Sequence, residues 1–369
     1  MKTGFFWDES CFWHGGGAYA LTLPIGPYVQ PLVSGGLPEN PETKRRLKNL
    51  LDVTGLLAEL DAKSAPSSSR EALLRVHPES YLDDFAAMSA SGGGELGRRT
   101  PFLVGGYDIA TRSAGLAQAA IVQVAEGRLA NAYSLSRPPG HHCLPDFPNG
   151  FCLLNNIAIG VEDAFAQRLA DRVVVIDWDV HHGNGTEAIY LDRADVLTIS
   201  IHQDRNYPLD TGSFDDRGSG DGDGANINVP LPPGCGHATY IEVMERIVGP
   251  AVADFRPDLI VVACGFDAGA FDPLAHMLCS AETFATMTAM TMSWADALCD
   301  GKLVLVHEGG YSEAYVPFCG HAAIQTLARS AIQAPDPLAE TLRGRQPGAD
   351  QTAWVSGQIT QIVEALGLD

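Results

Sequence analysis

Short apolar runs alternate along the chain with longer segments in which apolar residues recur every three or four positions. The runs predict strands at 4–7, 132–136, 173–176, 196–202, 259–263 and 303–306. The longer segments predict helices near 41–60, 70–89, 106–127, 155–170, 185–191, 237–255, 281–298, 313–330 and 353–366. Apolar runs without polar alternation are typical of strands covered on both faces, as in sheets whose parallel strands are joined by helices. We therefore predict an α/β fold with a central parallel sheet flanked by helices.

No Pro/Ser-rich linker or block of charge divides the 369 residues, so we predict one domain over 1–369. Between the strands and helices lie an irregular segment at 8–40, a glycine loop at 91–94 and a polar loop at 203–225. Four aromatic residues in or next to segment 8–40 either line a site or a subunit contact, or simply pack against the domain. These residues are Trp7, Phe12, Trp13 and Tyr28.

The formal net charge of −21 opposes nucleic-acid binding, because phosphate recognition requires clustered Lys and Arg. It suits either cationic substrates or a surface kept acidic for solubility. The basic run Lys44, Arg45, Arg46 and Lys48 is expected to form a solvated helix face. Eight scattered cysteines without a C-x-x-C pair predict reduced, buried thiols. We expect no signal peptide, and no apolar run approaches the ~18 residues of a membrane-spanning helix. We therefore predict a cytoplasmic protein with no membrane association.

The stretch R-V-V-V-I-D-W-D-V-H-H-G-N-G at 172–185 carries the strongest chemical signal. It runs from a β-branched strand directly into Asp177, Asp179 and His181, which stand at every second position. In an extended chain such residues point the same way, and ligands of open α/β sheets bind at the carboxyl ends of strands. Two carboxylates and an imidazole fixed there predict a divalent cation.

Three further predicted strands also end in residues suited to chemistry. They lead to His141 and His142, to Asp267, and to Tyr311 on a Gly-Gly turn. Asp179, His181 and Asp267 around one ion would leave a position open for water, which is the pattern of catalytic zinc. A histidine pair supplies proton transfer near neutral pH, and a tyrosine hydroxyl can donate to a developing oxyanion.

These motifs resemble those of the zinc-dependent histone deacetylase family, in order and spacing over almost the whole chain. The resemblance is closest to the bacterial class II-type members, the histone deacetylase-like amidohydrolases. It implies the arginase/deacetylase fold. The matching segments are R-P-P-G-H-H (137–142), N-G-F-C-L-L-N-N (149–156), I-D-W-D-V-H-H-G-N-G (176–185), S-I-H-Q-D (200–204), G-F-D-A (265–268) and H-E-G-G-Y (307–311).

The resemblance also implies roles for individual residues. One Zn²⁺ per chain would be held by Asp179, His181 and Asp267. His142 corresponds to the general base and acid, with His141 as its electrostatic partner and Tyr311 as the oxyanion donor. Asp177 is expected to orient His141, and Asn184 stands beside His142 where many relatives carry Asp. Substrate contacts are expected from Gly150, Phe151, Tyr207, Leu274 and Gly309, and structural K⁺ from Asp177, Asp179, His181, Ser200 and Ile201.

Two positions depart from the family pattern. The aspartate that holds substrate backbone at the rim in many relatives has no counterpart near Arg98 to Pro101. By this resemblance, Leu274 occupies the position at which polyamine deacetylases carry Glu.

The primary hypothesis is a homo-oligomeric (dimeric or tetrameric) zinc amidohydrolase that acts on acetyl- or short acyl-lysine. An acetylpolyamine deacetylase and an esterase are alternatives at the same site, and an arginase-like two-metal hydrolase would need a second carboxylate near Asp267. A protein that binds acyl-lysine without turnover is the alternative of another class.

Overall fold

The computed structural model describes residues 1–17, 19–20, 23–24, 32–33 and 38–368. Its centre is an eight-stranded sheet in the order β12-β11-β10-β13-β14-β9-β1-β6, with every neighbouring pair parallel. In that order the strands are Asn226–Leu231, Val196–Gln203, Val173–Asp177, Leu259–Cys264, Leu303–His307, Asn131–Ser134, Thr3–Phe6 and Asp61–Lys63. The α/β prediction is confirmed.

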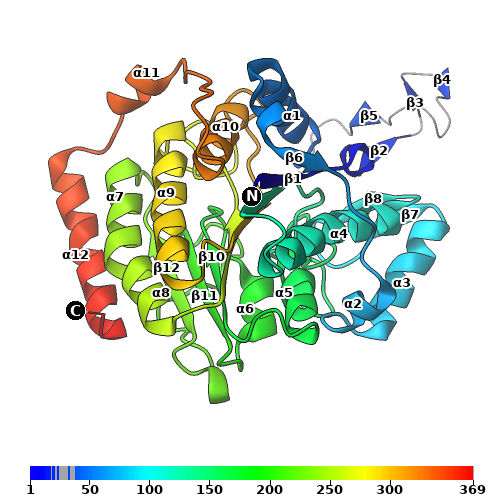
Figure 1. The fold of residues 1–369 in the computed structure, drawn as a ribbon, viewed down its shortest axis with the longest axis horizontal. Coiled ribbons are helices and arrows are strands. Elements are labelled where there is room, and N and C mark those ends of the chain that lie inside the picture. Colours follow the sequence, from blue (N-terminus) through cyan, green and yellow to red (C-terminus); the bar gives the residue numbers. More distant parts are fainter. Residues whose placement is uncertain (18, 21–22, 25–31, 34–37, 369) are drawn as a thin grey trace.

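Helices cover both faces of this sheet, as Figure 1 shows. The period-2 geometry of a strand divides β10 between them: Val174 and Ile176 join one apolar cluster, whereas Val173 and Val175 join the other. The first cluster includes residues of α1 (Glu42–Thr54), α7 (His237–Val243), α9 (Ala281–Leu298), α10 (Val316–Leu327) and α12 (Ala349–Leu366). The second includes residues of α4 (Gly106–Ala125), α5 (Asn156–Ala166) and α6 (Asn184–Tyr190).

Smaller elements complete the described fold. Three are two-stranded antiparallel pairs: β2 (Gly16–Gly17) with β5 (Leu32–Val33), β3 (Tyr19–Ala20) with β4 (Leu23–Pro24), and β7 (Gly93–Glu95) with β8 (Pro101–Leu103). The remaining helices are α2 (Arg70–Leu74), α3 (Glu79–Ala90), α8 (Gly249–Phe255) and α11 (Ala339–Arg343). Short 3₁₀ turns lie at Glu9–Trp13, Leu56–Glu59 and Gly220–Gly222, and a π-helical turn at Met244–Val248 joins α7 to α8.

Several predicted boundaries were wrong, each for a local reason. The helix expected at 70–89 is two helices, because Pro78 has extended backbone and starts α3 afresh. The helix expected to reach residue 60 ends at Gly55, which adopts φ 88°. Strands β2 to β8 and β12 were not predicted. Strand β12 follows the polar loop and reads Asn-Ile-Asn-Val-Pro-Leu, and the proline is tolerated because β12 is the edge of the sheet.

The expectation of a solvated basic face was wrong for Lys44, which is 0% exposed. Its Nζ lies 3.2 Å from Glu39 Oε1, and Arg137 Nε donates to the same carboxylate at 2.9 Å. A helical pattern cannot reveal such a buried ionic group, because Glu39 lies outside the helix and Arg137 comes from a distant part of the chain.

The aromatic residues near the N-terminus have different outcomes. Phe12 is buried in the core, and Trp7 and Trp13 pack against it, as the packing alternative predicts. Tyr28 lies outside the described residues. All eight cysteines are free and buried, as predicted. Among the helices described, none combines the length and apolar character needed to cross a membrane.

Candidate active site

Three side chains meet at the carboxyl ends of β10 and β13. His181 Nδ1 lies 3.2 Å from Asp179 Oδ1 and 3.1 Å from Asp267 Oδ2, and all three residues are buried. Strand β10 ends at Asp177, so Asp179 and His181 belong to the turn that follows it rather than to an extended strand. The predicted convergence with Asp267 therefore depends on this turn.

Main-chain amides hold both carboxylates in place. Val180 N–H donates to Asp267 Oδ1 at 2.8 Å, and Gly309 N–H donates to Asp179 Oδ2 at 2.7 Å. A Cβ atom on Gly309 would lie 2.2 Å from Asp267 Oδ2, and one on Gly265 would lie 2.2 Å from Asp179 Oδ2. Glycine is thus required where two turns pack against the carboxylates.

The electrostatics of this group suit a cation. Burial, followed by the charge of Asp179, raises the pKa of Asp267 to about 6. Burial by itself would lower the pKa of His181, but hydrogen bonds with Asp179 and Asp267 raise it to about 10. A divalent ion bound by both carboxylates would neutralise their charge. The ligand atoms of the three residues all lie within 4.8 Å of one another, and the donor set fits Zn²⁺.

His141 and His142 are adjacent in sequence, and their ring centroids lie 4.0 Å apart, but their partners differ. His141 Nδ1 lies 2.9 Å from Asp177 Oδ2. Burial opposes a charge on His141, but Asp179 and Asp177 outweigh it and raise its pKa well above the usual value. His142 Nδ1 donates to the amide oxygen of Asn184 at 2.8 Å. Burial, together with the charges of His141 and His181, lowers the pKa of His142 well below its usual value.

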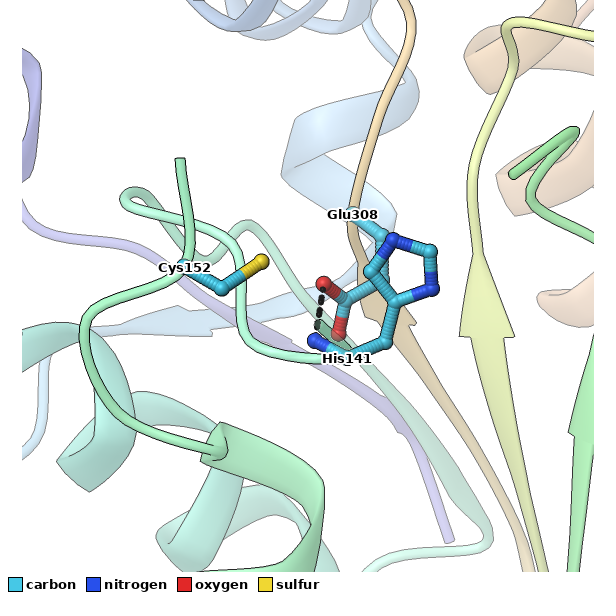
Figure 2. Close-up of side chains that lie close together, drawn as sticks. All are labelled: His141, Cys152 and Glu308. Atoms are coloured by element: carbon cyan, nitrogen blue, oxygen red, sulfur yellow. Dashed lines mark hydrogen bonds between the residues drawn. The ribbon is translucent and has the colours of Figure 1, made fainter. Parts of the chain in front are cut away.

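Glu308 follows directly after β14 and lies beside His141 (Figure 2). Its Oε2 accepts the main-chain N–H of Gly140 at 2.6 Å and that of His141 at 3.1 Å. The Cys152 sulfur lies within 4.8 Å of this carboxylate, and Oε1 has no hydrogen-bond partner among the described residues. Burial raises the pKa of Glu308 to about 7. Sequence reasoning did not single out Glu308, although it stands in the H-E-G-G-Y motif.

Tyr311 follows β14 after the glycine turn that contains Gly310, which has φ 120°. Its ring centroid lies 6.3 Å from that of His181 and 5.9 Å from that of Phe151. Burial, followed by the charge of Asp267, raises the pKa of Tyr311 well above the usual value. The phenol therefore keeps its proton and can donate a hydrogen bond.

A cavity of about 570 Å³ leads from the surface to this group. Four of the predicted substrate contacts form its wall: Gly150, Phe151, Tyr207 and Leu274. Gly150 has φ 50°, and a Cβ there would lie 2.4 Å from His142 Cδ2. Only glycine therefore lets this wall approach the histidine. Gly309 is not among the described residues that line the cavity, because its amide binds Asp179 instead.

Comparison with known proteins identifies the family. The histone deacetylase domain profile matches residues 37–327. The chain is 54% identical over its full length to the histone deacetylase-like amidohydrolase of Pseudomonas aeruginosa, and covers 97% of that protein. The chain belongs to the histone deacetylase family.

Two further relatives extend the comparison of this histone deacetylase-family protein. A probable deacetylase of Archaeoglobus fulgidus is 38% identical over 73% of this chain and 75% of the relative. The crystal structure of the HDA15 HD domain aligns with 100% of this chain and 99% of its own, at a TM-score of 0.81 and 28% identity. The chain is thus a single α/β deacetylase-type domain and a hydrolase that acts on amides.

The rim of the cavity in this histone deacetylase-family enzyme contains polar residues that sequence reasoning missed. Glu95, Arg99 and Asn206 line it, and Glu95 Oε1 accepts the N–H of Thr100 at 3.2 Å. A carboxylate therefore does stand near the rim, from β7, whereas the sequence suggested none near Arg98 to Pro101. The hairpin of β7 and β8 brings it there, and this hairpin was itself not predicted.

Proposed function

We propose that this protein is a zinc-dependent deacylase that hydrolyses the amide of acetyl- or short acyl-lysine, or of a closely related acylated amine. The observation that carries the proposal is the floor of the cavity. There the His181 ring lies 6.0 Å from that of His142 and 6.3 Å from that of Tyr311, so a proton carrier and a hydroxyl donor flank the proposed metal ligands.

Asp179, His181 and Asp267 would hold one Zn²⁺, with a coordination position left open toward the cavity. The chemistry that such an ion supplies when bound is Lewis acidity, which lowers the pKa of water from 15.7 to about 7 and polarises a carbonyl.

The two histidines divide the remaining work. The hydrogen bond from His142 Nδ1 to Asn184 leaves Nε2 with its lone pair, and the lowered pKa keeps this imidazole neutral. Nε2 therefore takes the proton of the attacking water and later returns it to the departing amine. His141 stays charged beside Asp177, so it favours the anionic transition state electrostatically.

Tyr311 supplies the hydrogen bond for the carbonyl oxygen as negative charge develops on it. Its raised pKa keeps the hydroxyl protonated for this purpose. Phe151 and Tyr207 form apolar walls above the floor, and they suit the methylene stem of a lysine or another linear amine.

A structural K⁺ is proposed beside the zinc site, at Asp177, Asp179, His181, Ser200 and Ile201. The parallel register of β10 and β11 supports it, since Asp177 pairs with Ser200. Buried oxygen atoms from two adjacent strands form an environment suited to such an ion.

The test is a substrate panel of acetyl-lysine peptides, longer acyl-lysines, acetylpolyamines and a simple acetyl ester, with metal content measured on the same preparation. We expect hydrolysis of acyl-lysine and about one zinc per chain. The matched variant is His142→Ala, which should retain zinc and hydroxamate inhibitor binding but lose turnover by about 10²–10⁴-fold. Binding of acyl-lysine without hydrolysis by the native protein would contradict the proposal, and so would hydrolysis of the ester alone. Preference for acetylpolyamine would identify the substrate as a related acylated amine rather than acyl-lysine.

A further inference from the structure

Asp272, in the segment between β13 and α9, contacts two parts of the site at once. Its Oδ2 accepts the main-chain N–H of Tyr311 at 2.7 Å, and its Oδ1 accepts that of Leu274 at 2.8 Å. Asp272 does not belong to the group of proposed metal ligands. Its two oxygens instead join the residue proposed to stabilise the oxyanion to a residue of the cavity wall.

The Tyr311 end of this link controls the position of a side chain on a glycine turn. Gly310 precedes Tyr311 with φ 120°, a backbone conformation that only glycine adopts readily. The turn by itself therefore does not define where the phenol lies. The Asp272 hydrogen bond fixes the main chain of Tyr311, and the edge-on contact with Phe151 orients its ring.

The Leu274 end controls the width of the cavity. Leu274 lines the wall, and its carbonyl oxygen accepts a hydrogen bond from Asn206 Nδ2 at 3.0 Å. Asn206 precedes Tyr207, which forms another part of the same wall. Hydrogen bonds therefore run from Asn206, next to Tyr207, through Leu274 and Asp272 to Tyr311.

We propose that Asp272 is a positioning residue that holds Tyr311 and Leu274 in one arrangement, and thereby sets both turnover and selectivity for acyl-chain length. The proposal rests on the deacylase function proposed above. A carboxylate suits this task because each of its two oxygens can accept a main-chain N–H, whereas an amide side chain offers only one accepting oxygen.

Asp272→Asn tests this directly, because the amide replaces one accepting oxygen by an NH₂ group that faces an N–H donor. We expect kcat on acetyl-lysine to fall about 10–100-fold, since a displacement of ~1 Å at a reacting group has effects of this size. The rate ratio of hexanoyl- to acetyl-lysine should change at least several-fold. In a Tyr311→Phe background, the same substitution should cost little further kcat, because the group that it positions is already lost.

The matched control is Asp258→Asn. Asp258 Oδ2 also accepts two main-chain N–H groups, from Asp171 at 2.8 Å and Arg172 at 2.9 Å, but at the amino ends of β10 and β13, opposite the site. Asp258→Asn should keep both the kcat and the acyl-length ratio of the native protein. Asp272→Glu is the second variant, for use if Asp272→Asn does not fold. It retains two carboxylate oxygens on a longer side chain, and the acyl-length ratio should change in it too.

The outcomes separate the two proposals. If the native protein hydrolyses no acyl-lysine, the proposed function fails, and Asp272 is then judged from affinities for hydroxamates of increasing chain length. An unchanged affinity profile in the Asp272 variants would overturn its role. If the native protein is active, native turnover and selectivity in both Asp272→Asn and Asp272→Glu would overturn the positioning role of Asp272. The role would also be overturned if Asp272→Asn lowered kcat by the same factor in the Tyr311→Phe background as in the native protein.

Discussion

His142 donates its Nδ1 proton to the side-chain oxygen of Asn184 at 2.8 Å, so the proposed general base rests against a neutral amide. The adjacent His141 instead meets the carboxylate of Asp177. Adjacent imidazoles thus receive opposite electrostatic environments, and only one of them is kept neutral.

The first prediction concerns this amide. Asn184→Asp should raise the pKa of His142 by about 1 unit, because a nearby negative charge favours the imidazolium. Since the base must be neutral to accept a proton, the acidic limb of the kcat/KM profile should move to higher pH by a similar amount. Rates measured from pH 5 to 9 would show this, and a limb that does not move would exclude His142 as the titrating base.

The second prediction concerns the phenol. Tyr311→Phe should lower kcat about 10²–10³-fold, the effect of removing one oxyanion donor. Tyr315→Phe is the matched control, because Tyr315 also uses its hydroxyl, at 2.7 Å from Asp336 Oδ2 and 3.1 Å from Ala281 N. The control should lose about 1–2 kcal/mol of stability but keep its kcat. Equal rate losses in the two variants would contradict the assignment of Tyr311.

The third prediction concerns metal removal. Chelation should abolish turnover and lower the melting temperature, because Asp179 and Asp267 are then left buried against each other. At free zinc 1,000 times its Kd, the stabilisation lost is about 4 kcal/mol. Asp267→Ala should contain almost no zinc and show no melting shift with chelator, whereas Asp258→Asn should behave as the native protein. Two divalent ions per chain in metal analysis would instead favour the arginase-like alternative.

The fourth prediction concerns Glu308 and the pH dependence of stability. Burial raises its pKa from 4.5 to about 7. Between these pH values the folded protein keeps a proton that the unfolded chain has released, so this residue makes stability fall as pH rises from about 4.5 to 7. The difference corresponds to roughly 3 kcal/mol at ~1.4 kcal/mol per pH unit. Glu308→Gln should remove this dependence in urea unfolding measured at pH 5 and pH 7.5.

Glu187→Gln provides the comparison of opposite sign. Burial opposes ionisation of Glu187 as well, but hydrogen bonds led by that of His182 lower its pKa. Its contribution is therefore present above pH 4.5 and is lost as pH falls, so Glu187→Gln should destabilise the protein at neutral pH. A Glu308→Gln variant with the native pH dependence would show that the buried carboxylate does not titrate in this range.

Local pattern was sufficient for much of the fold. The apolar runs at 173–176 and 259–263 correctly predicted β10 and β13. Strands covered by helices on both faces need apolar residues at every position, and this pattern is visible in the local sequence. Strand β12 was missed because its apolar residues alternate with Asn226 and Asn228, which hydrogen-bond to Glu187 of α6. Their burial depends on a helix that the local pattern does not specify.

The sequence by itself determined the α/β architecture, the buried thiols and the residue types that gather at the strand ends, because these follow from periodicity and from the cost of burying charge. Only the tertiary structure decided that Glu308 lies beside His141, that Glu95 lines the cavity, and that Asp272 joins Tyr311 to Leu274. Each of these contacts joins main-chain amides or cavity walls from different loops. Main-chain donors are the same for every residue type except proline, so the amino-acid sequence gives no local sign of them.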